Sequence, residues 1–184
     1  MNEYVQGILY RYLHAPTKNL QISPDKHTDI YYGSMVQYSA DADSRSPLDT
    51  LVIKRVQVIV GALLYYVLDV NNKILVALST IGSQQASRTK CTSAAISQLL
   101  NYIDTYPNVV IANRSSSIVL IDHSYAPFLN EIMSIVQAVA HIFISKNLPI
   151  PANNGPLLTL TQIIKLFISS TAKSELVSLF ITAK

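Results

Sequence analysis

Hydrophobic positions recur at helical spacing through the first half of the chain. The clearest pattern runs over Ile53–Leu68, where apolar residues at intervals of three and four form one continuous stripe. The same spacing predicts shorter helices over Glu3–Leu13, Lys73–Ile81 and Thr89–Tyr102. Residues 15–51 are rich in Pro, Ser, Asp and Thr, and this composition predicts a long irregular connection after the first helix. The first half is therefore expected to be a helical cluster.

After Pro107 the spacing of apolar residues changes from four toward two. Four segments are predicted as strands, and they are 109–112, 117–121, 139–144 and 157–161. The segment from Gln162 onward is apolar enough to be helical, and Ser169, Ser170 and Thr171 are good N-cap candidates for a final helix. The predicted fold class is α+β, with an N-terminal helical cluster followed by three strands and then a helix.

Composition places the chain among globular proteins. Its 184 residues are 49% hydrophobic and 14% charged, which is enough apolar material for a sizeable core. The most apolar stretch, Val56–Val70, has about 15 residues and contains Gln57 and Asp69, which is short of the roughly 20 needed to span a bilayer. The single Cys91 allows no internal disulfide, and the N-terminus lacks the apolar core of a secretory signal. We expect an intracellular chain with no membrane insertion.

The positive charge is compatible with nucleic acid but does not establish it. The formal net charge is +3 and the pI is near 8.9. Proteins that bind nucleic acid usually gather Lys and Arg on one face, and only Lys54 with Arg55 and Arg88 with Lys90 approach such a cluster. These four residues are the candidate nucleic-acid contacts.

Other chemistry is weakly represented in the sequence. The histidines, His14, His27, His123 and His141, are dispersed, and this argues against a metal site. The tyrosines of the predicted helices, Tyr65, Tyr66 and Tyr102, are expected to pack in the core with their hydroxyls exposed rather than to stack on bases.

Several segments, taken in order, resemble a known family. The segments Tyr32–Tyr38, Lys54–Tyr66 and Ala94–Pro107 are similar to the end of a reverse transcriptase and its connection. His123-Ser124-Tyr125-Ala126 stands where the family has His or Tyr, then Ser-Asp-Ala. Ser170–Leu176 stands where the family has Ser-x-Ala-Glu-x-Glu. The chain thus resembles the reverse transcriptase and ribonuclease H region of copia-type retrotransposon polyproteins.

The resemblance implies a two-metal ribonuclease H site in which carboxylates hold magnesium and cut the RNA strand of an RNA:DNA hybrid. Glu175 matches the helix glutamate of that site, and it is the one remaining catalytic and metal-binding candidate. Tyr125 stands at the position of the first aspartate, and Lys173 stands at that of an accessory glutamate. Asp122 lies three residues before Tyr125, so on a regular strand it faces the other side of the sheet. We therefore expect a catalytically inactive chain, a pseudoenzyme that binds no magnesium.

Three regions follow from these patterns. Residues 1–51 are expected to hold the reverse-transcriptase tail, 52–106 a helical connection, and 107–184 a truncated ribonuclease H-like domain, since the sequence ends within an apolar segment. The alternative is a non-enzymatic helical module for protein interaction. In both cases we expect self-association through apolar helices or an open sheet edge.

Overall fold

The computed structural model describes residues 2–15, 18–26, 48–84, 89–126, 136–150, 152–164, 168 and 170–183. The chain divides into two compact units. Unit 1 comprises Met1–Tyr31 and Asp43–Val110, and unit 2 comprises Tyr32–Ala42 and Ile111–Lys184. Most of the predicted irregular connection lies outside the described residues, as do the Tyr32–Tyr38 segment, His27 and Arg88.

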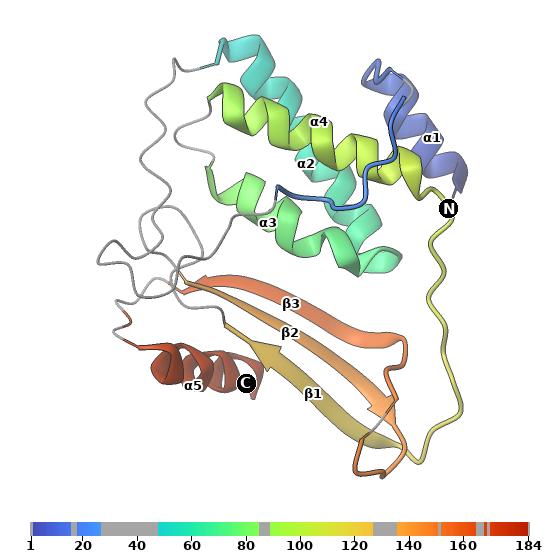
Figure 1. Ribbon diagram of the computed structural model, residues 1–184, viewed down its shortest axis with the longest axis vertical. Coiled ribbons are helices and arrows are strands. Elements are labelled where there is room, and N and C mark those ends of the chain that lie inside the picture. The colour runs from blue at the N-terminus through green and yellow to red at the C-terminus, as the bar shows by residue number, and fades with distance from the viewer. Residues whose placement is uncertain are drawn as a thin grey trace. The chain divides into compact units, whose positions relative to one another are not determined.

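Unit 1 contains the predicted helices. They are α1 (Asn2–Arg11), α2 (Thr50–Asp69), the 3₁₀ turn η1 (Asn72–Ile74), α3 (Leu75–Ser83) and α4 (Lys90–Thr105) (Figure 1). Side chains cap two of these helices. The Asp49 carboxylate accepts a hydrogen bond from Thr50 N at 2.8 Å, and Thr89 and Thr92 form a capping box at the start of α4. Such caps satisfy backbone N–H groups that have no partner within a helix.

One hydrophobic core holds unit 1 together. It combines the apolar faces of all four helices and η1, and its members are Val5, Ile8, Leu9, Tyr12, Val56, Ile59, Leu63, Tyr66, Val67, Ile74, Leu75, Ala77, Leu78, Ile81, Ile96, Leu99, Leu100 and Ile103. The apolar residues that recur at helical spacing in the sequence are therefore the residues that the structure buries. Polar contacts add to the packing, because the Tyr4 hydroxyl donates to the Ala62 carbonyl at 3.0 Å and Arg55 donates to the Tyr12 carbonyl.

The tyrosines of α2 differ from the expectation. Tyr66 is 1% exposed and its hydroxyl is buried, whereas Tyr65 is 56% exposed and lies edge-on to Tyr4 at 5.7 Å between ring centroids. The buried Asn71 side chain interacts with the Tyr66 hydroxyl, although their geometry falls short of a regular hydrogen bond, and neither has another partner among the described residues. The prediction of core tyrosines with exposed hydroxyls is wrong for both, because periodicity alone does not choose which of two adjacent rings turns inward.

Helix α2 carries more apolar surface than unit 1 covers. Its exposed large hydrophobic side chains are Leu51, Val58, Leu64, Tyr65 and Leu68. The helix has 20 residues and a mean hydropathy of 1.8 over its best 18-residue window, so by length and composition alone it could cross a membrane. Core helices of soluble proteins pass the same test, and α2 contributes five residues to the core. The apolar helix is longer than the stretch of about 15 residues expected from the sequence.

Unit 2 is an antiparallel sheet with one helix on it (Figure 1). The strands β1 (Val119–Tyr125), β2 (Val136–Ser145) and β3 (Pro156–Ile164) pair in the order β1-β2-β3. They confirm three of the four predicted strands. The order of strand, strand, strand and helix is thus present, and the α+β class is confirmed.

The predicted strand Val109–Ala112 is wrong. This segment has no regular secondary structure, although the Ala112 carbonyl accepts a hydrogen bond from Gly155 N at 2.9 Å. Among the described residues this is the one backbone hydrogen bond between residues 109–112 and the β3 end of the sheet, and a single bond does not make a ladder.

The side chain of Asn154 ties this segment to the sheet. Its amide nitrogen donates to the carbonyls of Arg114 at 3.0 Å and Ile144 at 2.7 Å. Its oxygen accepts from Arg114 N at 2.6 Å and Gly155 N at 3.0 Å. Close approach requires glycine at 155, since a Cβ there would meet the Asn113 Oδ1 at 2.0 Å. We refer to these contacts as the Asn154 clamp.

Helix α5 (Thr171–Thr182) begins at the N-cap predicted from the sequence. Ser170 is the cap and its hydroxyl accepts from Lys173 N at 3.4 Å. The predicted helix was too long at its start, because Gln162–Ile164 belong to β3. Val177 and Ile181 of α5 pack on a small core whose buried members are Ala126, Val136, Ala138, Ile164 and Ile168. One face of the sheet is therefore covered by α5.

Candidate functional site

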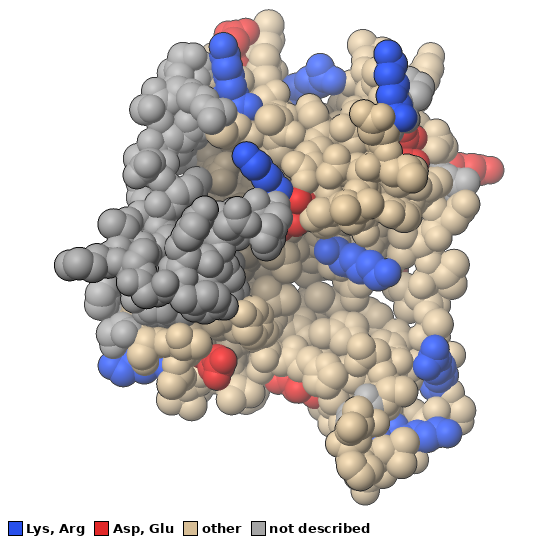
Figure 2. All heavy atoms as spheres, in the orientation of Figure 1, with Lys and Arg blue, Asp and Glu red and all other residues tan. Residues whose placement is uncertain are grey.

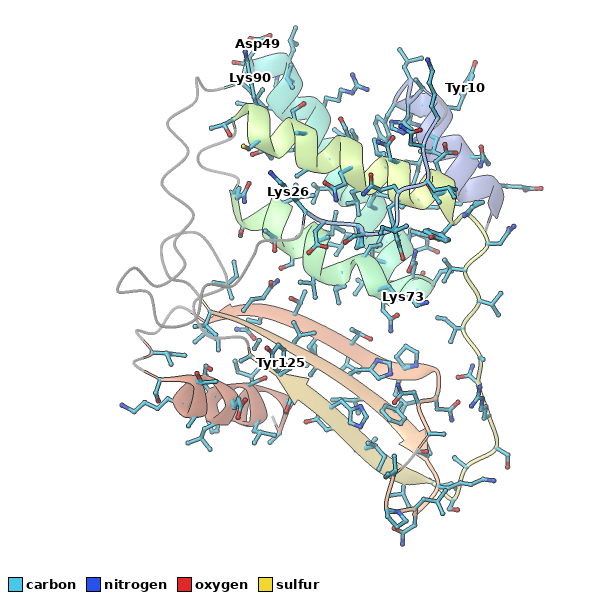
Figure 3. The ribbon with its side chains drawn as sticks, viewed as in Figure 1. Tyr10, Lys26, Asp49, Lys73, Lys90 and Tyr125 are labelled. Atoms are coloured by element: carbon cyan, nitrogen blue, oxygen red, sulfur yellow. The ribbon has the colours of Figure 1, made fainter. Side chains whose placement is uncertain are left out.

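The end of β1 and the first turns of α5 are joined directly. The buried Ser174 hydroxyl lies 2.9 Å from the Ala126 carbonyl, to which it donates, and Ala126 is fully buried. Tyr125 and Glu175 are the chain neighbours of these two residues. The structure therefore brings together the two sequence positions that the ribonuclease H interpretation pairs. Both side chains are exposed, Tyr125 by 59% (Figure 3).

The two side chains nevertheless belong to different surroundings. Strand β1 pairs with β2 in an unbroken register, with Tyr125 opposite Val139 and Asp122 opposite Ile142. Alternate residues of a strand face opposite sides of a sheet. Asp122 faces α5, since its Oδ2 accepts a hydrogen bond from the Thr182 hydroxyl at 2.7 Å. Tyr125 thus belongs to the face away from α5.

Asp122 does not lie where the resemblance implies an aspartate. It meets α5 at Thr182, seven residues after Glu175, and seven residues of helix rise about 10 Å. A two-metal site needs carboxylates around cations that are only about 4 Å apart. Within the described residues, no group of three or more His, Cys, Asp or Glu side chains could hold a metal ion. Of the candidate acids, Glu175 alone lies at the junction of β1 and α5.

The basic candidates lie in unit 1. Lys54 and Arg55 are exposed on α2, and Lys90 is the first residue of α4; the fourth candidate, Arg88, is outside the described part. Figure 3 shows Lys90 and Asp49 at the same end of the unit. On the face drawn in Figure 2, Lys and Arg side chains stand singly, with acidic side chains near some of them. This distribution gives no continuous basic stripe on that face.

Arg55 has a setting that the sequence did not indicate. It lines a pocket with His14, at the end of α1, and with Ser93 and Ser97 of α4. These residues are about 40 positions apart in the chain, so no local spacing could have connected them. A lone histidine after a predicted helix was the one available signal.

Two other histidines are brought together by the sheet. His123 and His141 are direct cross-strand partners, and each ring lies 5.1 Å from the ring of the buried Phe143, measured between centroids. The sequence showed these histidines as dispersed. Predicting the pair would have required the register of β1 against β2.

A cluster of tyrosines in unit 1 has altered acidity. Burial raises the pKa of Tyr66 above its ordinary 10.0; the nearby Asn71 side chain opposes this shift, and Tyr102 adds to it. Burial also raises the pKa of Tyr102, and Tyr106 raises it further. The rings of Tyr102 and Tyr106 lie 5.1 Å apart. With a raised pKa, Tyr66 and Tyr102 are neutral at physiological pH, so these two hydroxyls do not act as a general base there.

Comparison with known proteins does not add to this geometry. No protein-family model matches the chain, and neither a search of curated proteins nor a search of solved structures found a match.

Proposed function

We propose that this chain is part of a retroelement polyprotein, in which a helical unit derived from the reverse-transcriptase connection precedes a ribonuclease H-like unit that binds an RNA:DNA hybrid without cutting it. The observation that carries the proposal is the path of unit 2. Three consecutive antiparallel strands are followed by a helix on one face of the sheet, and Ser174 anchors that helix at the end of β1. This agrees with the order of elements that the resemblance implies.

The proposed lack of cleavage rests on the acids. Tyr125 replaces the strand carboxylate and faces away from α5, and Asp122 is held by Thr182 near the other end of that helix. A tyrosine hydroxyl, with an ordinary pKa near 10, is a poor magnesium ligand at neutral pH. Glu175 by itself does not assemble two metal ions.

A cleavage and binding assay tests the proposal. Purified chain is incubated with an end-labelled RNA:DNA hybrid and Mg²⁺, with a DNA duplex of the same length as the comparison. We expect binding that weakens as salt rises, no cut RNA, and the same behaviour in Glu175→Ala. Mg²⁺-dependent cleavage that Glu175→Ala abolishes would show that the inactive assignment is wrong. Failure to bind the hybrid at low salt would contradict the nucleic-acid role itself.

A second function is favoured by one observation, the exposed apolar side of α2. In this alternative the chain is a non-enzymatic interaction module that self-associates through Val58, Leu64 and Leu68. Sedimentation equilibrium tests it with Val58→Lys and Leu68→Lys, compared with Lys73→Met at an exposed site elsewhere in unit 1. The alternative predicts an oligomer that only the α2 variants convert to monomer. A wild-type chain that is monomeric at all concentrations would rule it out.

A further inference from the structure

The pocket that contains Arg55 lies entirely within unit 1. It is a hollow of about 250 Å³ between the end of α1, the first half of α2 and the middle of α4. Its floor is apolar and includes the buried Ile59 and Ile96. Its polar lining comes from Arg55, His14, Ser93 and Ser97, and among the described residues no carboxylate lines it. The electrostatic character of the hollow is therefore positive.

Hydrogen-bond donors from α2, from α4 and from the segment after α1 line this hollow. The Arg55 guanidinium has five N–H donors, and the described residues occupy it with one contact, to the Tyr12 carbonyl. His14 Nε2 is shielded from solvent and has no hydrogen-bond partner among the described residues. His14 is also one of the residues that line the hollow.

The two serines have different roles. The Ser97 hydroxyl donates to the Ser93 carbonyl at 3.0 Å, so it offers the hollow an acceptor rather than a donor. No hydrogen bond of the Ser93 hydroxyl is found in the described part of the chain, which leaves that hydroxyl as the donor on the α4 side. Lys90 lies on the same face of α4, since positions 90, 93 and 97 follow helical spacing.

We propose that this hollow binds a phosphate group. A guanidinium, an imidazole and a hydroxyl from three segments of the lining offer hydrogen-bond donors to the oxygens of a tetrahedral anion, whereas a carboxylate presents two oxygens in one plane. The size is adequate for more than the anion, because a cavity of about 150 Å³ already holds benzene. A phosphate and part of its sugar fit, with the sugar against Ile59 and Ile96.

The phosphate has two conceivable sources, the backbone of a nucleic acid and a free mononucleotide. Both present the same group to Arg55, and the site depends on residues of unit 1 alone. It therefore does not depend on the ribonuclease H interpretation of unit 2. If the hybrid fails to bind but phosphate binds, the pocket stands without the proposed function.

Titration of the full chain with inorganic phosphate, followed by calorimetry and ³¹P NMR, tests the site. We expect saturable one-site binding that Arg55→Met weakens about ten-fold, the loss of one charge-assisted contact. Ser93→Ala and His14→Leu should weaken it by smaller factors. Lys73→Met removes the same charge at the other end of unit 1 (Figure 3) and should leave the affinity within two-fold.

Two further measurements keep the result interpretable. Circular dichroism must show unchanged helix content in Arg55→Met, and Arg55→Lys, which keeps the charge but not the fork of donors, should bind with intermediate affinity. Competition by a short single-stranded oligonucleotide indicates a backbone phosphate, and competition by a nucleoside 5′-monophosphate alone indicates a free nucleotide. Absence of saturable binding, or an equal loss in Arg55→Met and Lys73→Met, would overturn the proposal.

Discussion

Replacement by alanine is expected to have opposite effects on stability at two serines of α5. Ser174 and Ser178 are both fully buried and lie one helical turn apart. The Ser174 hydroxyl donates to the Ala126 carbonyl at 2.9 Å and also lies 2.7 Å from the Thr171 carbonyl. The Ser178 hydroxyl has no hydrogen-bond partner among the described residues. Replacing each serine with alanine therefore removes a satisfied group in one case and an unsatisfied group in the other.

The magnitudes follow from this difference. Ser174→Ala loses about 1 kcal/mol of net hydrogen bonding and leaves the buried Ala126 carbonyl without that partner, which costs about 1–3 kcal/mol more. Alanine favours the helix by up to about 0.5 kcal/mol, so the variant should be less stable by about 1.5–4 kcal/mol. Ser178→Ala removes a buried hydroxyl that pays desolvation without compensation. It should be neutral or more stable by up to about 2 kcal/mol.

Hydrogen exchange is the suitable assay, because a chain of two units need not unfold in a single transition. The amides of α5 are compared by mass spectrometry in wild type, Ser174→Ala and Ser178→Ala, with α4 as the internal reference from unit 1. We expect faster exchange of α5 in Ser174→Ala only. Equal acceleration in both variants would show that the hydroxyl of Ser178 is bonded, and that hydrogen bonding does not explain how α5 is anchored.

Three other predictions concern glycine, asparagine and tyrosine. Gly155→Ala should destabilise unit 2 by about 1–2 kcal/mol, because the added Cβ clashes with neighbouring side chains. Gly61→Ala should stabilise unit 1 by about 0.5–1 kcal/mol, because the added Cβ has open space on a helix. Urea denaturation measures both. Asn154→Ala should lower the free energy of unfolding by about 1–2 kcal/mol, because four partly exposed hydrogen bonds are lost. Asn153→Ala, at the exposed neighbouring position, should cause no measurable change by the same method. The pKa of Tyr66 is raised in the folded state, so the stability that this group contributes is complete below pH 10 and is lost as the pH rises through the folded-state pKa. Tyr66→Phe should therefore make the loss of stability at alkaline pH shallower in thermal melts at increasing pH.

Much of the secondary structure could be predicted from the sequence because buried residues recur at helical spacing in unit 1 and at strand spacing in the sheet of unit 2. The α2 stripe, the periodicity of Thr89–Tyr102 and the Ser170 cap place three helices correctly. Val109–Ala112 misled the prediction because a short apolar run rich in β-branched residues is typical of a strand, while pairing depends on a neighbouring strand that the run itself does not specify. Gly155, which donates to the Ala112 carbonyl, is 43 residues away in the sequence, and only the fold puts it beside this segment.

The candidate site residues likewise differ in how far the sequence could predict their positions. Residues that a motif fixes relative to a strand or a helix, such as Tyr125 and Glu175, were placed near the same junction by the structure. The pocket around Arg55 was not predictable, because His14 and Ser93 reach it from other helices, and helix packing angles are not encoded in periodicity. The burial of the Tyr66 hydroxyl was missed for the same reason.

The Asn154 clamp also bears on how this protein ages. An asparagine followed by glycine is prone to deamidation, because the glycine nitrogen can attack the side-chain amide carbon, close a succinimide ring and release ammonia. Water then opens the ring to aspartate or isoaspartate. In the folded chain Gly155 N donates to the Ala112 carbonyl, and both atoms of the Asn154 amide are engaged. Cyclisation therefore has to wait until the clamp opens, and the aspartate it yields would turn a carboxylate oxygen toward the carbonyls of Arg114 and Ile144. Deamidation at Asn154 would thus accumulate with each opening of the clamp, and deamidated molecules would re-form the clamp less readily than unmodified ones.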